Sequence, residues 1–178
     1  MFRSIWLTGL VLCAAGLVVS AGGQKDAPKD TPKHARFDQL KKLEGTWVAV
    51  GKDGKATDQI VSVFKVTAAG SAVQETIFPG AAHEMISVYH LDGKDLVMTH
   101  YCALRNQPRM KADAAAPANK LAFTFIGGAN IDPGKDMHMH EGSITILDDN
   151  TIESTWQAWD KGKPAEGHKM SMKLVRKK

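Results

Sequence analysis

Gly45-Thr46-Trp47 is the stretch that decides the fold of this chain. It follows a short run with helical spacing, and the rest of the sequence reads as antiparallel strands up to a last strand that carries Arg176. A glycine just before a tryptophan allows a tight turn where a barrel closes, and an arginine stem can cover the indole ring. The sequence therefore predicts a small closed barrel in which Gly45, Trp47 and Arg176 are structural closure residues.

Ten runs bounded by turn residues predict ten strands. They span 45–51, 59–67, 72–78, 83–91, 95–103, 109–112, 120–127, 137–147, 151–159 and 168–176. The connections carry suitable turn residues, such as Pro79-Gly80, and no helical segment separates neighbouring strands. The expected fold class is all-β, an antiparallel up-and-down β-barrel of about ten strands with a short N-terminal helix at 37–43.

The N-terminal region predicts export. Arg3 precedes an apolar run at 5–19, and Val19-Ser20-Ala21 offers small residues for cleavage, so 1–21 is expected to be a signal peptide. Residues 22–36 read as a disordered tether of Lys, Asp and Pro, and 37–178 as the barrel domain. We therefore expect a periplasmic or secreted protein with no transmembrane segment after signal cleavage.

Charge and cysteine content argue against a nucleic-acid partner and against an internal disulfide. The formal net charge is +4 at pH 7, with basic residues scattered along the chain, so no nucleic-acid partner is expected. Cys102 is the only cysteine outside the predicted signal peptide. An internal disulfide is then impossible, and the fold must rest on its core or on a metal or ligand.

Alternation along the strands predicts which side chains face the interior. In the hairpin around 148–150, Ile146 is expected to pair with Ile152, Ile144 with Ser154, Gly142 with Trp156 and His140 with Ala158. The same parity directs His138 and His140 inward, and in the last strand it directs His168 inward with Met170 and Met172. Around 92–93, the face that carries Tyr89, Met98, His100 and Cys102 is favoured as inner over the face that carries Glu84 and His90.

The inward histidines are the candidate metal ligands. His138, His140 and His168, near methionine sulfur, form a set that suits copper, zinc or haem iron. The alternative is that these histidines lie at a solvated barrel mouth, where each needs only a hydrogen-bond partner. No cofactor is expected on balance, with haem or a soft divalent metal as the alternative.

The wall of the predicted cavity supplies the candidate ligand-binding residues. They are Phe64, Glu75, Tyr89, His100, Phe123, Phe125, Ile144 and Trp156. Glu75 shares a strand face with two apolar residues, where a carboxylate would orient the polar group of a ligand. A register slip of one residue would instead place Glu75 in solvent.

The chain carries no nucleophile elbow, no phosphate-binding glycine loop, no His-Glu-x-x-His helix and no Cys-x-x-Cys pair. We therefore expect an exported binding protein, not an enzyme, that encloses a small apolar or amphipathic molecule. Two alternatives stay open. One is a haem- or metal-binding barrel that uses its inward histidines, and the other is a filled barrel with a structural or interaction role.

The chain resembles the calycin group, which contains the lipocalins and fatty-acid-binding proteins. The resemblance rests on Gly45-x-Trp47 after a short helix, on the strand meander and on Arg176 in the last strand. Within that group the pattern is most similar to exported bacterial lipocalin-like proteins of unassigned function. The resemblance implies a barrel around a small hydrophobic ligand. The nitrobindins also begin with Gly-x-Trp, and that likeness implies haem ligation at or near His168. Val48-Ala49-Val50-Gly51 lacks their denser glycine pattern.

Overall fold

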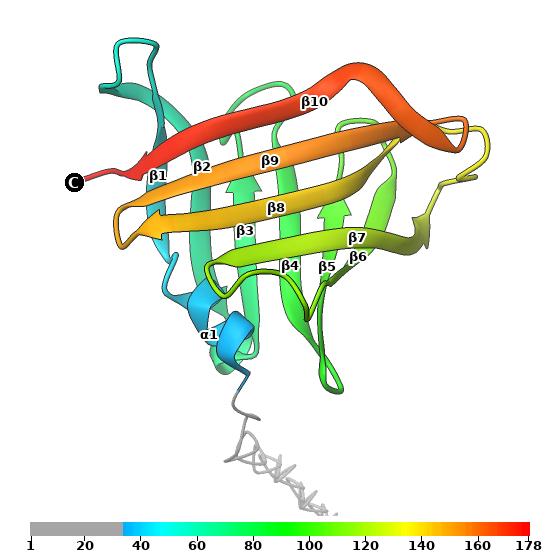
Figure 1. The fold of residues 1–178 in the computed structure, drawn as a ribbon, viewed down its shortest axis with the longest axis horizontal. Helices are drawn as coiled ribbons and strands as arrows, with labels where there is room; N and C mark the ends of the chain where they lie inside the picture. The colour runs from blue at the N-terminus through cyan, green and yellow to red at the C-terminus, as the bar shows by residue number, and fades with distance from the viewer. Residues whose placement is uncertain (1–33) are drawn as a thin grey trace, which may run out of the picture.

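The computed structural model describes residues 34–178, which form a closed barrel with one short helix (Figure 1). The predicted signal peptide and most of the predicted tether lie outside these residues. The elements are α1 Ala35–Lys41, β1 Gly45–Val50, β2 Ala56–Thr67, the 3-10 turn η1 Ala68–Gly70, β3 Ala72–Ile77, β4 Met85–Asp92, β5 Asp95–Tyr101, β6 Gln107–Ala112, β7 Lys120–Ala129, β8 His138–Asp148, β9 Thr151–Asp160 and β10 Lys163–Arg176.

Every strand pairs antiparallel with its neighbours in sequence, and β1 pairs with β10 to close the barrel. The predicted fold class, an antiparallel up-and-down barrel of ten strands, is confirmed. Of the residues that the structure describes, none belongs to a helix long and apolar enough to cross a membrane.

The element boundaries differ from the sequence prediction by up to five residues, and two of these differences have a clear local cause. The helix begins at Ala35, inside the predicted tether, because the His34 ring accepts a hydrogen bond from the Phe37 amide at 3.2 Å and caps the first turn. β10 begins at Lys163 because Lys161 and Gly162 both adopt positive φ, which makes a tight two-residue hairpin turn. The pairing of β10 with β9 then breaks between Pro164 and Lys169.

Helix α1 covers one end of the barrel. Its apolar residues Phe37 and Leu40 are fully buried in the barrel core. Arg36 donates to the carbonyl oxygens of Lys120 and Ala116, both at 2.6 Å, and Gln39 donates to Ala118 at 2.8 Å. We call this end, with α1 and the β6–β7 turn at 113–119, the helix end.

The predicted closure residues meet at the helix end. Trp47 is fully buried and donates from Nε1 to the Leu43 carbonyl at 2.8 Å, while the Arg176 guanidinium lies 4.5 Å from the indole centroid. Arg176 also donates to the carbonyls of Lys42 and Glu44. Gly45 has a φ of 131°, and a Cβ there would lie 2.9 Å from Arg176 Nη1, so a side chain at this position would collide with the arginine.

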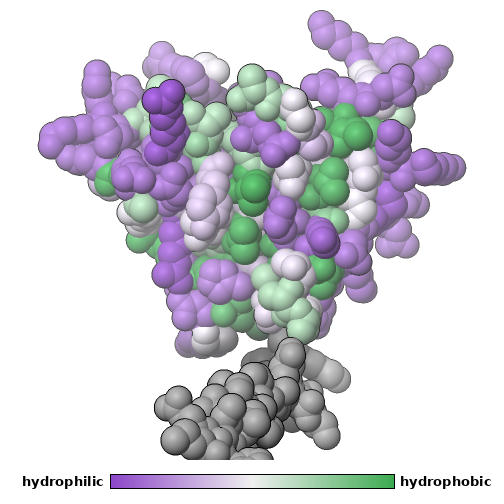
Figure 2. Space-filling model, turned by 180° about the vertical axis from the view of Figure 1, so that it is seen from behind, coloured by the Kyte–Doolittle hydropathy of each residue, from purple (hydrophilic) through white to green (hydrophobic). Residues whose placement is uncertain are grey.

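The core fills the barrel interior. Along β4 and β5 the face with Tyr89, Met98 and His100 is the buried one, as predicted. The opposite face is only partly polar, since Ile86, Val88 and Val97 alternate with the inward residues. Figure 2, which views the molecule from behind, shows apolar side chains dispersed among hydrophilic ones on the outer surface.

Candidate functional site

A buried polar cluster lies inside the otherwise apolar barrel. Glu75, at the middle of β3, has only 2% of its surface exposed. Ser62 Oγ donates to Glu75 Oε1 and Tyr89 Oη donates to Glu75 Oε2, both at 2.7 Å. The three side chains come from β2, β3 and β4, which are adjacent in the sheet, so the cluster joins neighbouring strands across one wall of the barrel.

Strand register explains why these polar side chains face inward. Val73, Glu75 and Ile77 alternate along β3, and all three are buried. Glu75 pairs with Phe64 on one side and with Ser87 on the other, both of which are also buried. The orientation of Glu75 that the sequence left open is therefore inward.

The Glu75 carboxyl is not neutralised by an ion pair in the described part of the chain, since none of the ion pairs there includes Glu75. Burial raises the pKa of Glu75, and the hydrogen bonds from Ser62 and Tyr89 oppose that rise only in part. Burial, together with the neighbouring carboxyl, also raises the pKa of Tyr89, so the phenol remains a proton donor. The cluster therefore holds a carboxyl group whose charge is costly unless a ligand or proton neutralises it.

His100 lies across the interior from β10 and contributes a second polar group. Its Nδ1 is 2.9 Å from Ser87 Oγ, and its ring centroid is 4.9 Å from that of Trp156. Desolvation lowers the pKa of His100 to about 4, so the imidazole is neutral at physiological pH. The contact with Ser87 uses Nδ1, which leaves the second ring nitrogen, Nε2, for a ligand or a water.

Glu75 and His100 line a small cavity that is rich in methionine. Its volume is about 20 Å³, and its lining residues are Val61, Ser62, Glu75, Ile77, Met85, His100, Met139, Ser154, Trp156, Met170 and Met172. This volume holds roughly one water molecule. Met170 is 36% exposed, so the cavity adjoins solvent on that side. We call this part of the barrel the methionine end.

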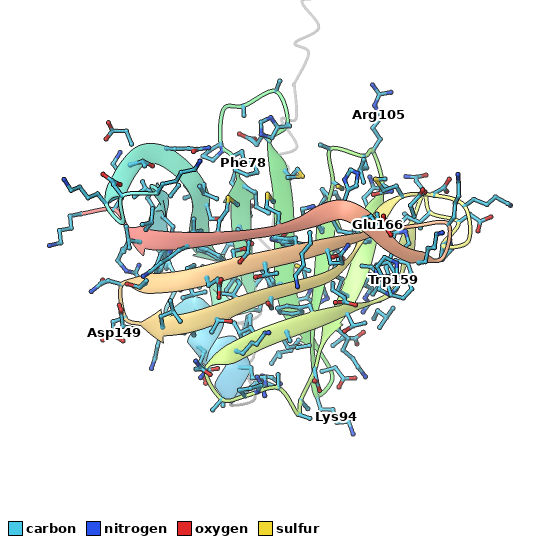
Figure 3. The ribbon with its side chains drawn as sticks, turned by 45° about the horizontal axis from the view of Figure 1, so that its top comes forward. Phe78, Lys94, Arg105, Asp149, Trp159 and Glu166 are labelled. Carbon is cyan, nitrogen blue, oxygen red and sulfur yellow. The ribbon has the colours of Figure 1, made fainter. Side chains whose placement is uncertain are left out.

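Figure 3 shows how the two ends are separated. Phe78 and Arg105, in the β3–β4 and β5–β6 connections, lie at the opposite end of the barrel from Lys94, in the β4–β5 turn. Met85 follows the first of these connections and Met139 lies at the start of β8, so both are remote from α1. The cavity therefore lies toward the end that the helix leaves uncovered.

The predicted ligand-binding residues divide into three groups. Glu75, His100 and Trp156 line the cavity. Phe64, Tyr89, Phe123 and Ile144 are buried core residues that do not line it. Phe125 is only partly buried, and its ring contacts those of His138 and His140 at centroid distances of 4.5 and 5.1 Å.

Sequence reasoning missed several lining residues. Ser62, Ser154, Met85 and Met139 were not among the predicted ligand contacts. The bulge in β8 breaks the alternation that predicts His138 and His140 as inward, and Met139 faces the cavity instead. Ser62 and Ser154 gave only the weak signal of a small polar residue at an inward position, which a packed core also tolerates.

The predicted pairing of His140 with Ala158 is wrong. A β-bulge between Met139 and Glu141 shifts the register, so that Met139 pairs with Ala158 and His138 pairs with Trp159. Met139 therefore faces the cavity. The two histidines instead join Trp159, whose ring stacks on that of His140 at 3.8 Å and 12°.

The structure does not bring His168 to the other two histidines. It is exposed, in the part of β10 where pairing with β9 is interrupted, and not inward as predicted. Haem does not fit these residues, because an exposed histidine and an interior cavity of about 20 Å³ provide no enclosure for a group that needs a pocket of several hundred Å³. In the described part of the chain, no three His, Cys, Asp or Glu side chains are grouped as metal ligands.

No protein-family model matches the chain, and no curated protein matches it.

Proposed function

We propose that the barrel binds a small amphipathic molecule at its methionine end, with the polar group of the ligand directed at Glu75 and His100. One observation carries this proposal. The cavity is lined by four methionines and a tryptophan, and its wall also contains the Glu75 carboxyl, which has no ion-pair partner among the described residues, and the neutral imidazole of His100. Polar groups that make a core less stable are retained where they serve a function.

The polar side chains favour a ligand with a hydrogen-bonding group. Ser62 and Tyr89 each donate one hydrogen bond to Glu75, which leaves further lone pairs on the carboxylate oxygens. A hydroxyl or amine could donate to one of them and also meet His100 Nε2. An apolar ligand without such a group would leave these atoms unsatisfied, and that costs free energy in a low-dielectric site.

The methionines favour an adaptable site. A cavity of about 20 Å³ is too small for any ligand larger than water, so side chains must move on binding. Met139, Met170 and Met172 are partly exposed, and methionine has three flexible side-chain torsions and a polarizable sulfur. The barrel would therefore open by rearranging methionines around the apolar part of the ligand, and its backbone would stay in place.

We further propose that this is binding without catalysis. Ser87 and His100 form a hydrogen-bonded pair, but Ser87 has no exposed surface and does not line the cavity. A nucleophile must reach its substrate, and this hydroxyl cannot. The closed barrel and the contact of Arg176 with Trp47 support a lipocalin-like protein, and the sequence at 1–21 supports an exported one.

The test compares three probes that share one chain and differ in the polar group: dodecanol, dodecylamine and dodecanoate. Trp156 lines the cavity, so binding should change tryptophan emission, and Trp156→Phe should remove that change. We expect the alcohol and the amine to bind and the carboxylate to bind least, because Glu75 repels a second carboxylate. Glu75→Gln should reduce this discrimination. If none of the three probes binds, the barrel is a filled one with a structural or interaction role.

A further inference from the structure

We propose that His138 and His140 form a two-imidazole site for divalent copper beside the β8–β9 hairpin, separate from the cavity at the methionine end. The site consists of the His-x-His segment at the start of β8, the bulge that follows it, and the indole of Trp159 on β9.

The separation of the two imidazole nitrogens matches that of two adjacent ligands of one metal. In the structure, His138 Nε2 and His140 Nδ1 share a hydrogen bond of 3.0 Å, with ring centroids 5.2 Å apart, so metal binding would replace this bond and turn both rings toward a common centre. With imidazole–metal bonds of about 2.05 Å, two nitrogens at this separation would subtend an angle of about 94° at the metal. Tetragonal copper requires adjacent ligands near 90°, whereas a tetrahedral zinc site would spread the nitrogens further apart. The pair therefore favours copper over structural zinc.

The surroundings of His138 fix its tautomer so that Nε2 is the nitrogen with the lone pair. Its Nδ1 lies 2.9 Å from the Asp136 carbonyl oxygen, which can only accept, so Nδ1 carries the proton and Nε2 presents its lone pair. Metal-binding histidines commonly donate their second nitrogen to a carbonyl in this way, since the bond orients the ring. Without metal, the Nε2 lone pair accepts the Nδ1 proton of His140.

The His140 ring is held between aromatic neighbours. It stacks on Trp159 at 3.8 Å, and the Phe125 ring lies 5.1 Å away. When copper takes the place of the shared proton, the His140 proton moves from Nδ1 to Nε2, so the pair changes tautomer and no proton need be released. His138 has no exposed surface and His140 is partly exposed, so the metal would enter from the His140 side.

The charges and polar atoms near the pair suit a cation with oxygen ligands. Glu141, an acidic residue, directly follows His140 at the bulge. The Trp159 indole nitrogen is buried with no hydrogen-bond partner in the described part of the chain. An oxygen ligand on copper would offer it an acceptor. No third His, Cys, Asp or Glu joins the pair among the described residues, so water would complete the coordination.

The test titrates the purified protein with Cu²⁺ alone and records tryptophan emission, because copper bound at His140 would quench the stacked Trp159. We expect His140→Ala to weaken copper binding by roughly tenfold or more. His168→Ala, which removes an exposed histidine of β10, is the matched control and should leave affinity unchanged. Trp159→Phe removes both the quenched indole and the donor to a copper-bound oxygen, so it should lose most of the quenching and weaken copper binding less than His140→Ala does.

A second measurement keeps the proposal testable if emission is ambiguous. Electron paramagnetic resonance of the copper-loaded protein should show nitrogen coupling from two imidazoles, and His140→Ala should reduce it to one or none. The proposal is overturned if wild-type protein binds copper no better than His140→Ala, if His168→Ala has the same effect as His140→Ala, or if zinc binds more tightly than copper. Because the cavity is elsewhere, failure of this test would leave the ligand-binding proposal unaffected.

Discussion

The two ends of this barrel use aromatic and polar side chains in opposite ways. At the helix end, Trp47 is fully buried, its indole nitrogen donates to a carbonyl, and Arg176 covers the ring while it donates to two further carbonyls. At the methionine end, Trp156 borders a cavity, and Glu75 and His100 are buried with no ionic partner among the described residues.

The difference separates stability from binding. Polar atoms at the helix end bond to backbone carbonyls that would otherwise lack partners, so the closure is satisfied and rigid. Polar atoms at the methionine end keep unused hydrogen-bonding capacity, and the side chains around them are flexible. If this interpretation is correct, substitutions at the helix end should change mainly stability, and those at the methionine end mainly ligand affinity and pH dependence.

The largest effect is expected for Trp47→Ala. This substitution removes the largest fully buried side chain, its hydrogen bond to Leu43 and the surface that Arg176 covers. We expect a loss of about 3–5 kcal/mol in the free energy of unfolding, measured by urea denaturation.

Trp156→Ala is the matched control at the other end. The space left by the Trp156 side chain adjoins the cavity and polar side chains, so water can enter it. The loss in the free energy of unfolding should therefore be clearly smaller than for Trp47→Ala. Equal losses at the two positions would contradict the division between a stabilising end and a binding end.

The next effect concerns His100 and pH. Its folded pKa of about 4 lies below the usual 6.5, so the unfolded chain takes up a proton first as pH falls. The contribution of neutral His100 to the free energy of unfolding is therefore fully present above pH 6.5 and is lost progressively as pH falls to about 4. The loss should reach about 3 kcal/mol, measured by urea denaturation at several pH values.

Glu75 changes the free energy of unfolding with pH in the opposite direction to His100 over part of the same pH range. Its raised pKa makes stability fall as pH rises above the ordinary carboxyl value of 4.5 toward its folded pKa. The His100 contribution is therefore obtained from the difference between wild type and His100→Gln at each pH. A difference that does not change between pH 6.5 and 4 would show that His100 is not desolvated as the structure indicates.

Much of the fold was predictable from the sequence because its determinants are local. Alternation and turn residues located all ten strands, and the Gly45, Trp47 and Arg176 positions predicted where the barrel closes. The start of β10 was harder to predict, since the turn before it is tightened to two residues by Lys161, which adopts a positive φ that lysine rarely adopts.

The candidate site was predictable only in part, because parity fails at a bulge. Strand alternation correctly placed His100 inside and gave the interior as one of two alternatives for Glu75, since no irregularity interrupts β3 or β5 near them. On β8 a single extra residue exchanged the faces of Met139 and the flanking histidines. The cavity's size was not predictable either, because it depends on how far the methionine side chains fill the space between the walls.

The smallest change in stability, and the sharpest test of the comparison, is expected for Met172→Leu. Met172 lines the cavity opposite Ser154 and is partly exposed, so a branched side chain of similar volume should cost less than about 1.5 kcal/mol. Met110→Leu is the control, because Met110 is fully buried in the core and does not line the cavity. Both variants should unfold at similar urea concentrations, yet only Met172→Leu should weaken dodecanol binding, since leucine lacks the flexible torsions that opening the cavity requires. Equal affinity in the two variants would mean that the methionines merely fill space, and that the cavity wall opens by another route or not at all.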